Sequence, residues 1–187
     1  MMNFFVINGH KFYPYAKGEL NHTLFEKIIE IVSPGNSVQT TIIENGYDVK
    51  EEIEKYKLAD FIIFQTPMNW FSVPWSFKKY IDEVYLHNIF YKGTADYGRG
   101  GLFKGKKYMY SITCNPSEDV FDNPNLFFGT QSPEDLIVAL HKIQQFCGME
   151  PVKSYFCFDV VHNPDIEKYL KGLDNHLHTY VLNDRLA

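Results

Sequence analysis

Cysteine is scarce in this chain of 187 residues, which has only Cys114, Cys147 and Cys157. The number is odd, the spacing is wide and no Cys-x-x-Cys occurs, so neither a disulfide framework nor a zinc site is indicated. We expect three reduced, buried thiols. His176 and His178 would fall on different faces of a helix, which is wrong for sharing a metal. The sequence predicts no metal site.

Long apolar runs and clusters of basic residues are also missing. No apolar run approaches the roughly 20 residues that a membrane-spanning helix needs, and the first residues form neither a basic leader nor a small-residue cleavage site. The net charge is −5, and no block of Lys and Arg could neutralise a row of phosphates. We therefore expect a cytoplasmic protein with no membrane span and no nucleic-acid partner.

Several catalytic fingerprints are absent as well. The chain has no Gly-x-Gly-x-x-Gly, no Gly-x-x-x-x-Gly-Lys-Ser/Thr and no Gly-x-Ser-x-Gly, which counts against Rossmann dehydrogenases, P-loop nucleotidases and α/β-hydrolases. A response-regulator receiver needs acidic side chains where this chain has Asn8 and Gln65. The acidic pairs at 51–52, 118–119 and 134–135 are expected to be solvated faces or first turns of helices.

Aromatic residues, in contrast, are abundant at 17% of the chain. Rings in such number either fill the core or line a site and a subunit interface. The length suffices for one full core, so we expect a single domain over residues 1–187.

Apolar periodicity predicts five strands that alternate with five helices. Each parallel pair of strands needs a crossover helix, so we predict an α/β protein with a flavodoxin-like, doubly wound, five-stranded parallel sheet in the order 2-1-3-4-5 and helices on both faces. The strands are expected at 3–8, 37–44, 59–65, 107–113 and 151–161, and the helices at 18–32, 48–58, 74–87, 133–146 and 164–182.

In this strand order the loops after the first, third and fourth strands converge on one crevice. The first loop, residues 9–22, ends at a helix amino terminus that can bind phosphate. The third loop, residues 65–75, offers aromatic rings and rigid prolines, and Trp75 is expected to face the sheet. The fourth loop, residues 112–116, offers a hydroxyl, an amide and backbone donors. A flavin needs this combination of phosphate donors, aromatic wall and polar edge.

Several motifs together point to a known family. They are Ile7-Asn8-Gly9, Gly18-Glu19-Leu20-Asn21, Tyr47-Asp48-Val49-Lys50, Pro74-Trp75, Lys78-Lys79-Tyr80-Ile81-Asp82, Tyr97-Gly98, Gly100-Gly101-Leu102, Gly105-Lys106-Lys107-Tyr108-Met109 and Gly148-Met149-Glu150-Pro151. With these motifs the chain resembles, nearly end to end, the modulator-of-drug-activity-B type of NAD(P)H:quinone oxidoreductase in the flavodoxin-like quinone reductase superfamily.

This resemblance implies an FAD-bound homodimer that oxidises NADPH or NADH and passes two electrons to quinones. It also implies which residues contact FAD. The phosphates would lie against Tyr15, Ala16, Lys17, Gly18, Glu19, Leu20, Asn21 and His22. The ring would lie against Pro67, Met68, Asn69 and Trp70, then Tyr97, with its polar edge at Thr113, Cys114, Asn115 and Pro116.

The expected mechanism is ping-pong hydride transfer through flavin N5, which needs no catalytic side chain. Our candidates for an apolar acceptor pocket are Phe71, Phe121, Phe127 and Phe128, completed by residues 87–97 of a partner chain. Two alternatives stay open. One is an FMN-dependent azoreductase or nitroreductase of the same fold, and the other is a regulatory subunit of an ion-efflux system, with or without flavin.

Overall fold

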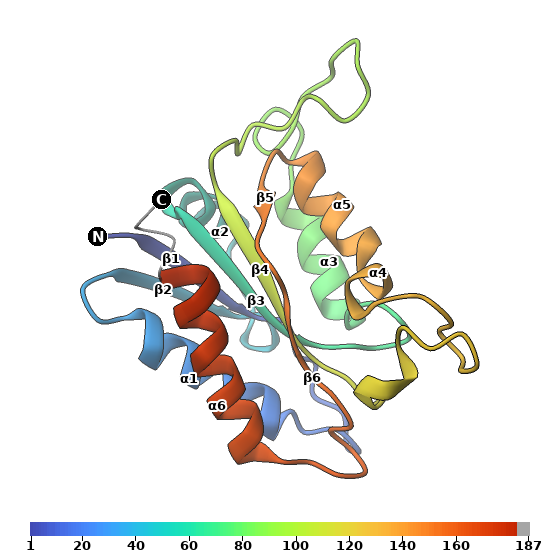
Figure 1. The fold of residues 1–187 in the computed structure, drawn as a ribbon. Coiled ribbons are helices and arrows are strands. Elements are labelled where there is room, and N and C mark those ends of the chain that lie inside the picture. Colours follow the sequence, from blue (N-terminus) through green and yellow to red (C-terminus); the bar gives the residue numbers. More distant parts are fainter. Residues whose placement is uncertain (183–187) are drawn as a thin grey trace.

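The computed structural model of the protein describes residues 1–182 and contains one parallel sheet (Figure 1). The strands are ordered β2-β1-β3-β4-β5, and β6 also pairs with β4. This order confirms the predicted doubly wound arrangement. The strands are β1 (Asn3–Asn8), β2 (Ser37–Ile42), β3 (Phe61–Pro67), β4 (Lys107–Thr113), β5 (Glu150–Pro151) and β6 (Tyr155–Cys157).

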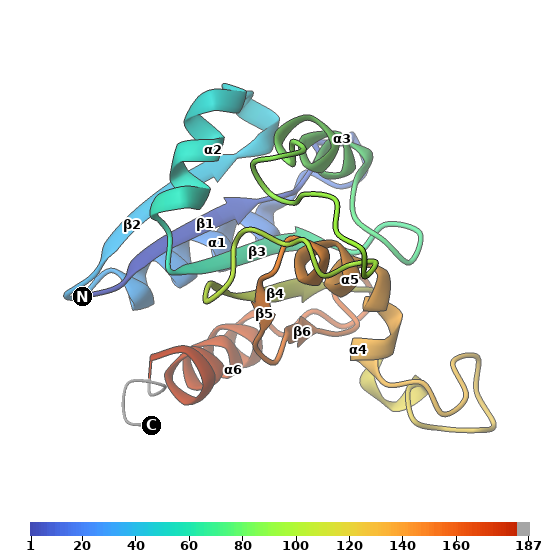
Figure 2. The same ribbon diagram turned by 90° about the horizontal axis from the view of Figure 1, so that it is seen from above.

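Helices cover both faces of the sheet, as Figure 2 shows. α1 (Glu19–Val32) and α6 (Ile166–Leu177) pack on one face. α2 (Val49–Leu58), α3 (Trp75–Val84) and α5 (Val138–Phe146) pack on the other. The short helices are η1 (Ile43–Asn45), η2 (Glu118–Val120), α4 (Pro133–Leu136) and η3 (His178–Leu182). Among residues 1–182, no helix is long and apolar enough to cross a membrane.

Local chemistry explains where the helices begin. The Asp48 carboxylate accepts hydrogen bonds from the N–H groups of Lys50 and Glu51, at 2.9 and 3.1 Å, and so satisfies two donors of the first turn of α2. Ser132 and Asp135 form a reciprocal capping box at α4. The predicted helix over 133–146 is broken after Leu136 into α4 and α5.

The predicted fifth strand, 151–161, is wrong in two respects, because it is split into β5 and β6 and because β6 ends at Cys157. β5 pairs with Lys107 and Tyr108, and β6 pairs with the other end of β4. Between them the Ser154 N–H and hydroxyl both donate to the Glu134 carboxylate, at 2.7 and 3.0 Å. A backbone group used in this way is lost to the ladder, so the contact interrupts the strand.

Glu134 also makes the stability of this edge depend on pH. Burial acts to raise the pKa of Glu134, but the hydrogen bonds from His141 and Ser154 outweigh it and hold the pKa below its usual value. A carboxylate with a lowered folded-state pKa stabilises the fold above its unfolded pKa of about 4.3 and loses that contribution as the pH falls.

We therefore expect Glu134→Gln to lower the free energy of unfolding at pH 7, with a difference from the wild type that shrinks between about pH 5 and pH 3. Urea denaturation across this range measures it. Glu150→Gln, at an exposed position in β5, is the matched control and should keep the wild-type acid profile. A Glu134→Gln difference that stays constant as the pH falls through this range would contradict the argument.

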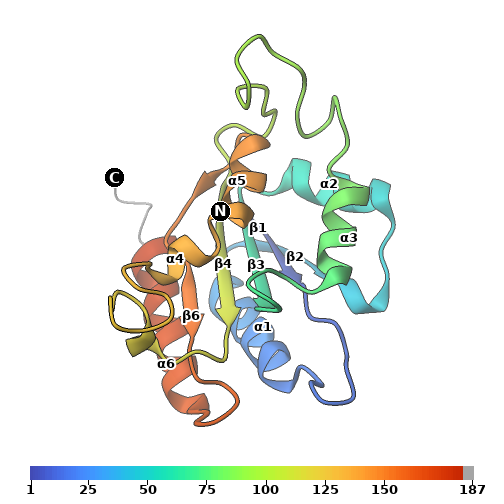
Figure 3. The same ribbon diagram turned by 90° about the vertical axis from the view of Figure 1, so that its right-hand side faces the viewer.

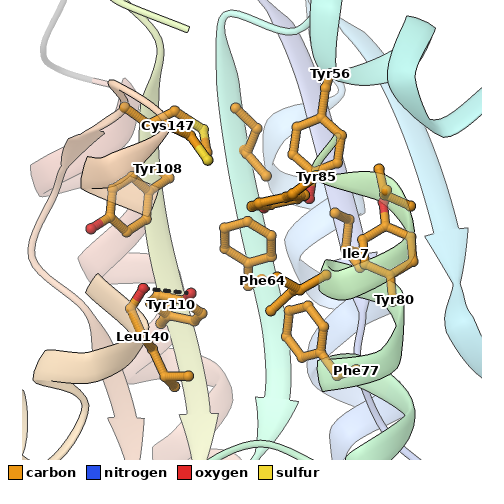
Figure 4. Close-up of a cluster of buried hydrophobic side chains, with 14 of the residues drawn as sticks. Ile7, Tyr56, Phe64, Phe77, Tyr80, Tyr85, Tyr108, Tyr110, Leu140 and Cys147 are labelled. Atoms are coloured by element: carbon orange, nitrogen blue, oxygen red, sulfur yellow. Dashed lines mark hydrogen bonds between the residues drawn. The ribbon is translucent and has the colours of Figure 1, made fainter. Parts of the chain in front are cut away.

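Many of the aromatic residues fill the core on the α3 side of the sheet, part of which Figure 4 shows. Tyr85 stacks on Phe90 with ring centroids 4.3 Å apart, and Tyr56 meets both rings edge-on. Buried tyrosines need partners for their hydroxyl groups. Tyr85 bonds to Tyr56 at 3.0 Å and to Gln144 at 2.8 Å, and Gln144 donates to Tyr110. These bonds connect α2, α5 and β4.

The acidic pair 51–52 lies in the first turn of α2, as the sequence predicted, and within this pair the Glu52 side chain is buried. The carboxylate accepts from the Thr41 hydroxyl at 2.8 Å, the Tyr80 hydroxyl at 2.6 Å and the Lys55 ammonium at 2.6 Å. A buried charge is tolerated only with such partners.

The three cysteines are free and buried, as expected. Burial raises the pKa of each thiol to about 12. The thiolate is the reactive form, so these groups are structural hydrophobes and not nucleophiles.

Candidate functional site

The loops after β1, β3 and β4 leave the sheet side by side. Asn8 and Gln65 are register partners across β1 and β3, and Pro67 and Thr113 are partners across β3 and β4. Pairing continues past the strand ends, because Gly9 N–H donates to the Gln65 carbonyl at 2.8 Å and Met68 N–H donates to the Thr113 carbonyl at 2.9 Å. The strand order thus places the predicted loops together at the edge of the sheet formed by the carboxyl ends of its strands.

The first loop folds back on itself before α1 begins. Tyr13 and Ala16 exchange two backbone hydrogen bonds of 3.1 and 3.0 Å, and the rings of Tyr13 and Tyr15 stack 5.3 Å apart. The first helical bond of α1 runs from His22 N–H to the Gly18 carbonyl at 2.8 Å. No side chain within residues 1–182 caps this terminus. The preceding N–H groups can therefore bind an anion such as phosphate.

His10 holds this loop from inside. Burial lowers the pKa of His10, so the neutral ring is favoured, and its Nε2 lies 3.2 Å from the Ala16 carbonyl, to which Nε2–H donates. Gly18 adopts φ +82°, and a Cβ there would lie 2.4 Å from the His10 ring. Gly18 is thus required both by its backbone conformation and by the close approach of His10.

Gly18→Ala should lower both stability and ligand binding at this loop. A left-handed residue with a Cβ costs about 1–2 kcal/mol, and at Gly18 the contact with His10 adds to this cost. Gly35→Ala is the control, because Gly35 has φ +73° and no described atom lies within 4 Å of its added Cβ. Thermal denaturation and flavin titration of both variants separate the effects. Equal losses at the two positions would show that the His10 contact is unimportant.

Asn21 lies in the first turn of α1, but its side chain is buried. Asn21 is 3% exposed, and its amide bonds to Asn8 and Gln65. Among the predicted phosphate contacts, Asn21 can therefore offer only its backbone. No local sequence pattern marks this buried contact, because Gln65 and Asn21 are 44 residues apart.

The third loop contains a tight turn with an unusual sequence. Asn69 and Ser72 exchange two backbone hydrogen bonds of 2.8 and 3.0 Å around Trp70 and Phe71. These two residues have φ values of 49° and 61°. A two-residue turn of this kind normally takes Asn-Gly, and the strain of bulky residues there is typical of functional sites. Trp70 is 94% exposed, so the turn presents its indole to solvent.

Trp75 does not face the sheet, which corrects the prediction from the sequence. It is 59% exposed, and the Lys11 ammonium lies 5.7 Å from its ring centroid. The reason is the helical period, since Phe77 is buried and lies two residues, or about 200°, further around α3. Trp75 therefore points to the opposite side.

The four predicted pocket phenylalanines form one cluster. Phe121 and Phe128 are buried and stack with centroids 4.5 Å apart, which gives the cluster a fixed base. Phe71 and Phe127 stack at 6.2 Å above them, and Phe127 is 81% exposed. Phe71 thus joins the third loop to the segment after β4, and the two exposed rings offer an apolar surface at the same edge.

Part of the backbone in the predicted polar edge after β4 is already hydrogen-bonded within the protein. Cys114 N–H donates to the Cys157 carbonyl at 2.9 Å, and the Pro116 carbonyl accepts from Asp159 N–H at 3.0 Å. Thr113 is buried, whereas Asn115 is exposed. Of the four predicted residues, Asn115 is therefore the one whose side chain is open to a ligand.

Tyr97 lies apart from the other predicted contacts. It belongs to the long connection between α3 and β4, which leads into the amino end of β4, whereas the site loops leave the carboxyl ends (Figure 3). Tyr97 is 94% exposed and lines an open hollow of about 930 Å³ with Phe146 and Arg99. Within one chain the structure does not bring Tyr97 to the site.

Comparison with known proteins agrees with this architecture. A family model described as having a flavodoxin-like fold matches residues 2–180. The NADPH:quinone oxidoreductase MdaB of Haemophilus influenzae is 38% identical over 94% of this chain and 97% of its own length. An Enterobacter ancillary protein of the glutathione-regulated potassium-efflux system, KefF, is 36% identical over 55% of this chain and 53% of its own.

Solved structures show the same fold at low identity. The NAD(P)H:quinone oxidoreductase of Methanothermobacter marburgensis has a TM-score of 0.72 with 17% identity, over 93% of this chain and 96% of that chain. The general stress protein 14 of Treponema denticola, in complex with FMN, has a TM-score of 0.68 with 14% identity, over 96% and 97%. The chain belongs to the family with the flavodoxin-like fold and, within it, to the group of the MdaB-type quinone oxidoreductases.

Proposed function

We propose that this protein is a flavin-dependent NAD(P)H:quinone oxidoreductase. One observation carries the proposal: uncapped N–H groups at the start of α1 and the exposed Trp70–Phe71 turn lie at the same edge of the sheet. An anion-binding terminus beside an aromatic face suits a phosphate joined to a flat ring. The 38% identity to a quinone oxidoreductase over most of both chains supports the same activity.

The residues at this edge fit a flavin. The first turn of α1 would bind the phosphates through its backbone, Trp70 would cover the ring, and Asn115 would donate to the polar edge. A Cβ at Gly9 would lie 2.4 Å from Phe77, so the chain needs a glycine where the first loop leaves the sheet. The chemistry that a flavin supplies when bound is two-electron transfer through N5, from NAD(P)H in one half of a ping-pong cycle and to the acceptor in the other.

The side chains around the acceptor would bind and orient rather than react. Phe71 and Phe127 present apolar rings that exclude water and stack on a flat acceptor. The cluster with Phe121 and Phe128 contains no titratable group. We propose that it binds quinones by shape and apolar contact, which places the reacting rings together.

FAD is the flavin that we propose, on the strength of the resemblance to the MdaB-type enzymes, and FMN is the alternative, favoured by the FMN-bound structural neighbour. The experiment is an absorbance spectrum of the purified protein, mass spectrometry of the released cofactor, and anaerobic bleaching with NADPH followed by recovery with menadione. A protein that stays colourless with added FAD and FMN would contradict the proposal.

A homodimer would bring Tyr97 to the site. The connection that contains Tyr97 and the loop that contains Trp70 lie at opposite ends of the sheet strands (Figure 1), and both side chains are 94% exposed. A twofold axis between these ends would place Tyr97 of each chain near Trp70 of its partner. We propose this arrangement for the completed pocket.

Light scattering measures the mass of the oligomer and so tests the dimer. Mixing Tyr97→Ala chains with Trp70→Ala chains should restore one intact site per heterodimer. No recovery on mixing would contradict a shared site.

Two other functions remain as candidates. The KefF match favours a regulatory subunit of an efflux system, for which stable partner binding without NADPH turnover is the expected result. An azoreductase or nitroreductase of the same fold would reduce those acceptors faster than quinones. We propose a cytoplasmic location, which the three free, buried thiols support, since thiols stay reduced in that compartment.

A further inference from the structure

Three buried amide side chains lie directly beneath the first loop. Asn8 ends β1, Gln65 lies in β3, and Asn21 lies in the first turn of α1. Their exposed fractions are 3%, 0% and 3%. Buried amides are costly unless they are bonded to one another or to the backbone, so three together call for an explanation.

The three amides are linked in a chain of hydrogen bonds, and the donor at one end fixes which way the bonds run. His10 N–H donates to Asn8 Oδ1 at 3.0 Å. A backbone N–H can only donate, so Asn8 must present its oxygen there. Asn21 Nδ2 donates to the same oxygen at 2.8 Å, which leaves Asn21 Oδ1 to accept from Gln65 Nε2 at 2.9 Å.

The other end of the chain is incomplete. Gln65 Oε1 is buried and has no hydrogen-bond partner among the described residues. Rotating the Gln65 amide would place this oxygen against Asn21 Oδ1, so the orientation with an unpaired oxygen is the one that keeps the rest of the chain bonded. The Gln65 orientation is therefore the one that agrees with the donor at His10.

We propose that Gln65 is a positioning residue for ligand binding at the first loop. Its Nε2 donates at the far end of the hydrogen-bonded amides and so supports the direction in which Asn8 Oδ1 accepts from His10 N–H. The same bonds hold the first turn of α1 against the end of β3, which leads into the Trp70 turn. The hydrogen-bonded amides thus fix the first turn of α1, which we assign to the phosphates, relative to the Trp70 turn, which we assign to the ring. The role in flavin binding rests on the proposed function.

Gln65→Glu and Gln65→Met test the polarity. Above neutral pH the carboxylate introduced by Gln65→Glu can only accept, so Asn21 must turn its amino group toward it and present oxygen to Asn8 Oδ1. Two oxygens then face each other, and Asn8 can relieve this conflict only by turning its own amide. His10 N–H would then face the Asn8 amino group and lose its acceptor. Methionine merely deletes one bond and leaves the direction of the others intact. We expect the dissociation constant for flavin to be about tenfold higher for Gln65→Glu than for Gln65→Met, since in Gln65→Glu the buried groups of Asn8 and His10 also lose partners.

Asn8→Asp separates polarity from charge. An aspartate at this position accepts from both His10 N–H and Asn21 Nδ2, so the chain keeps its direction although the new charge lies closer to the phosphate loop. Simple repulsion of phosphate predicts weaker flavin binding for Asn8→Asp than for Gln65→Glu, whereas the polarity model predicts the reverse order. Acidification should also restore binding selectively in Gln65→Glu, because a protonated carboxyl group can donate to Asn21.

Hydrogen exchange of the His10 amide tests the chain without any flavin. In the apoprotein it should be protected in the wild type, Gln65→Met and Asn8→Asp, and exchange faster in Gln65→Glu. A wild-type protein that binds no flavin refutes the proposed function. The exchange rates of the His10 amide then still test whether Gln65 orients the hydrogen-bonded amides. Equal His10 protection in Gln65→Glu and Gln65→Met would overturn the inference, as would equal flavin affinity in these two variants where the wild type binds flavin.

Discussion

Glu52→Ala is expected to lower the free energy of unfolding by about 3–5 kcal/mol, the usual effect of removing one partner of a buried ion pair. The substitution leaves the Lys55 ammonium without its carboxylate, and it removes the acceptor for the hydroxyl groups of Thr41 and Tyr80. Each buried group that loses its partner adds a desolvation penalty. A fold of this size has a total stability of about 5–15 kcal/mol, so the variant should be close to unfolding.

Chemical denaturation measures this loss, and the neighbouring Glu51→Ala is the matched control. Glu51 is exposed in the same helical turn, so its replacement should change stability by less than about 0.5 kcal/mol. Glu52→Gln should fall between the two, because an amide can still accept from Tyr80 but cannot balance the charge of Lys55. A loss below about 1 kcal/mol for Glu52→Ala would mean that water replaces the carboxylate at this position.

Trp70→Gly is expected to change stability and ligand binding in opposite directions. Trp70 is almost fully exposed and has φ 49°, so a glycine relieves backbone strain and removes no core contact. Stability should rise by up to about 1 kcal/mol. Flavin affinity should fall about 10-fold to 100-fold, because stacking on an aromatic ring contributes about 1–3 kcal/mol.

Trp75→Ala is the control for this second experiment. Trp75 is also an exposed tryptophan, but it contacts Lys11 and lies outside the Asn69–Ser72 turn. Its loss should leave flavin affinity within about twofold of the wild type, since it removes no part of the turn that we assign to the ring. If the two variants retain flavin equally, Trp70 does not cover the ring.

The elements most accurately predicted from the sequence are those whose pattern is local. β1 and β4 match their expected bounds because both faces of each strand are buried and the apolar run is continuous. α1 begins one residue later than predicted, after Gly18. The break between β5 and β6 was not predicted, because Glu134 and Ser154 are 20 residues apart and no local pattern marks their contact.

The site shows the same division. The strand order alone placed three loops at one edge, and the four phenylalanines named as candidates for the acceptor pocket do form one cluster. The facing of Trp75 follows from the helical period of α3, and there the prediction from the sequence was wrong. The buried side chain of Asn21 and the position of Tyr97, in contrast, could not be read from local patterns, because Asn21 contacts Gln65, 44 residues away, and Tyr97 lies in a long connection. Side-chain direction in a loop follows from such contacts and not from composition.

The split between β5 and β6 also bears on how the protein behaves at high concentration. A long unpaired edge strand offers a row of backbone groups to which another chain can add. Here that side of β4 carries two pieces of two and three residues, Pro151 has no N–H to donate, and Ser154 N–H is used by Glu134. The interruption therefore protects this side of the sheet against edge-to-edge aggregation.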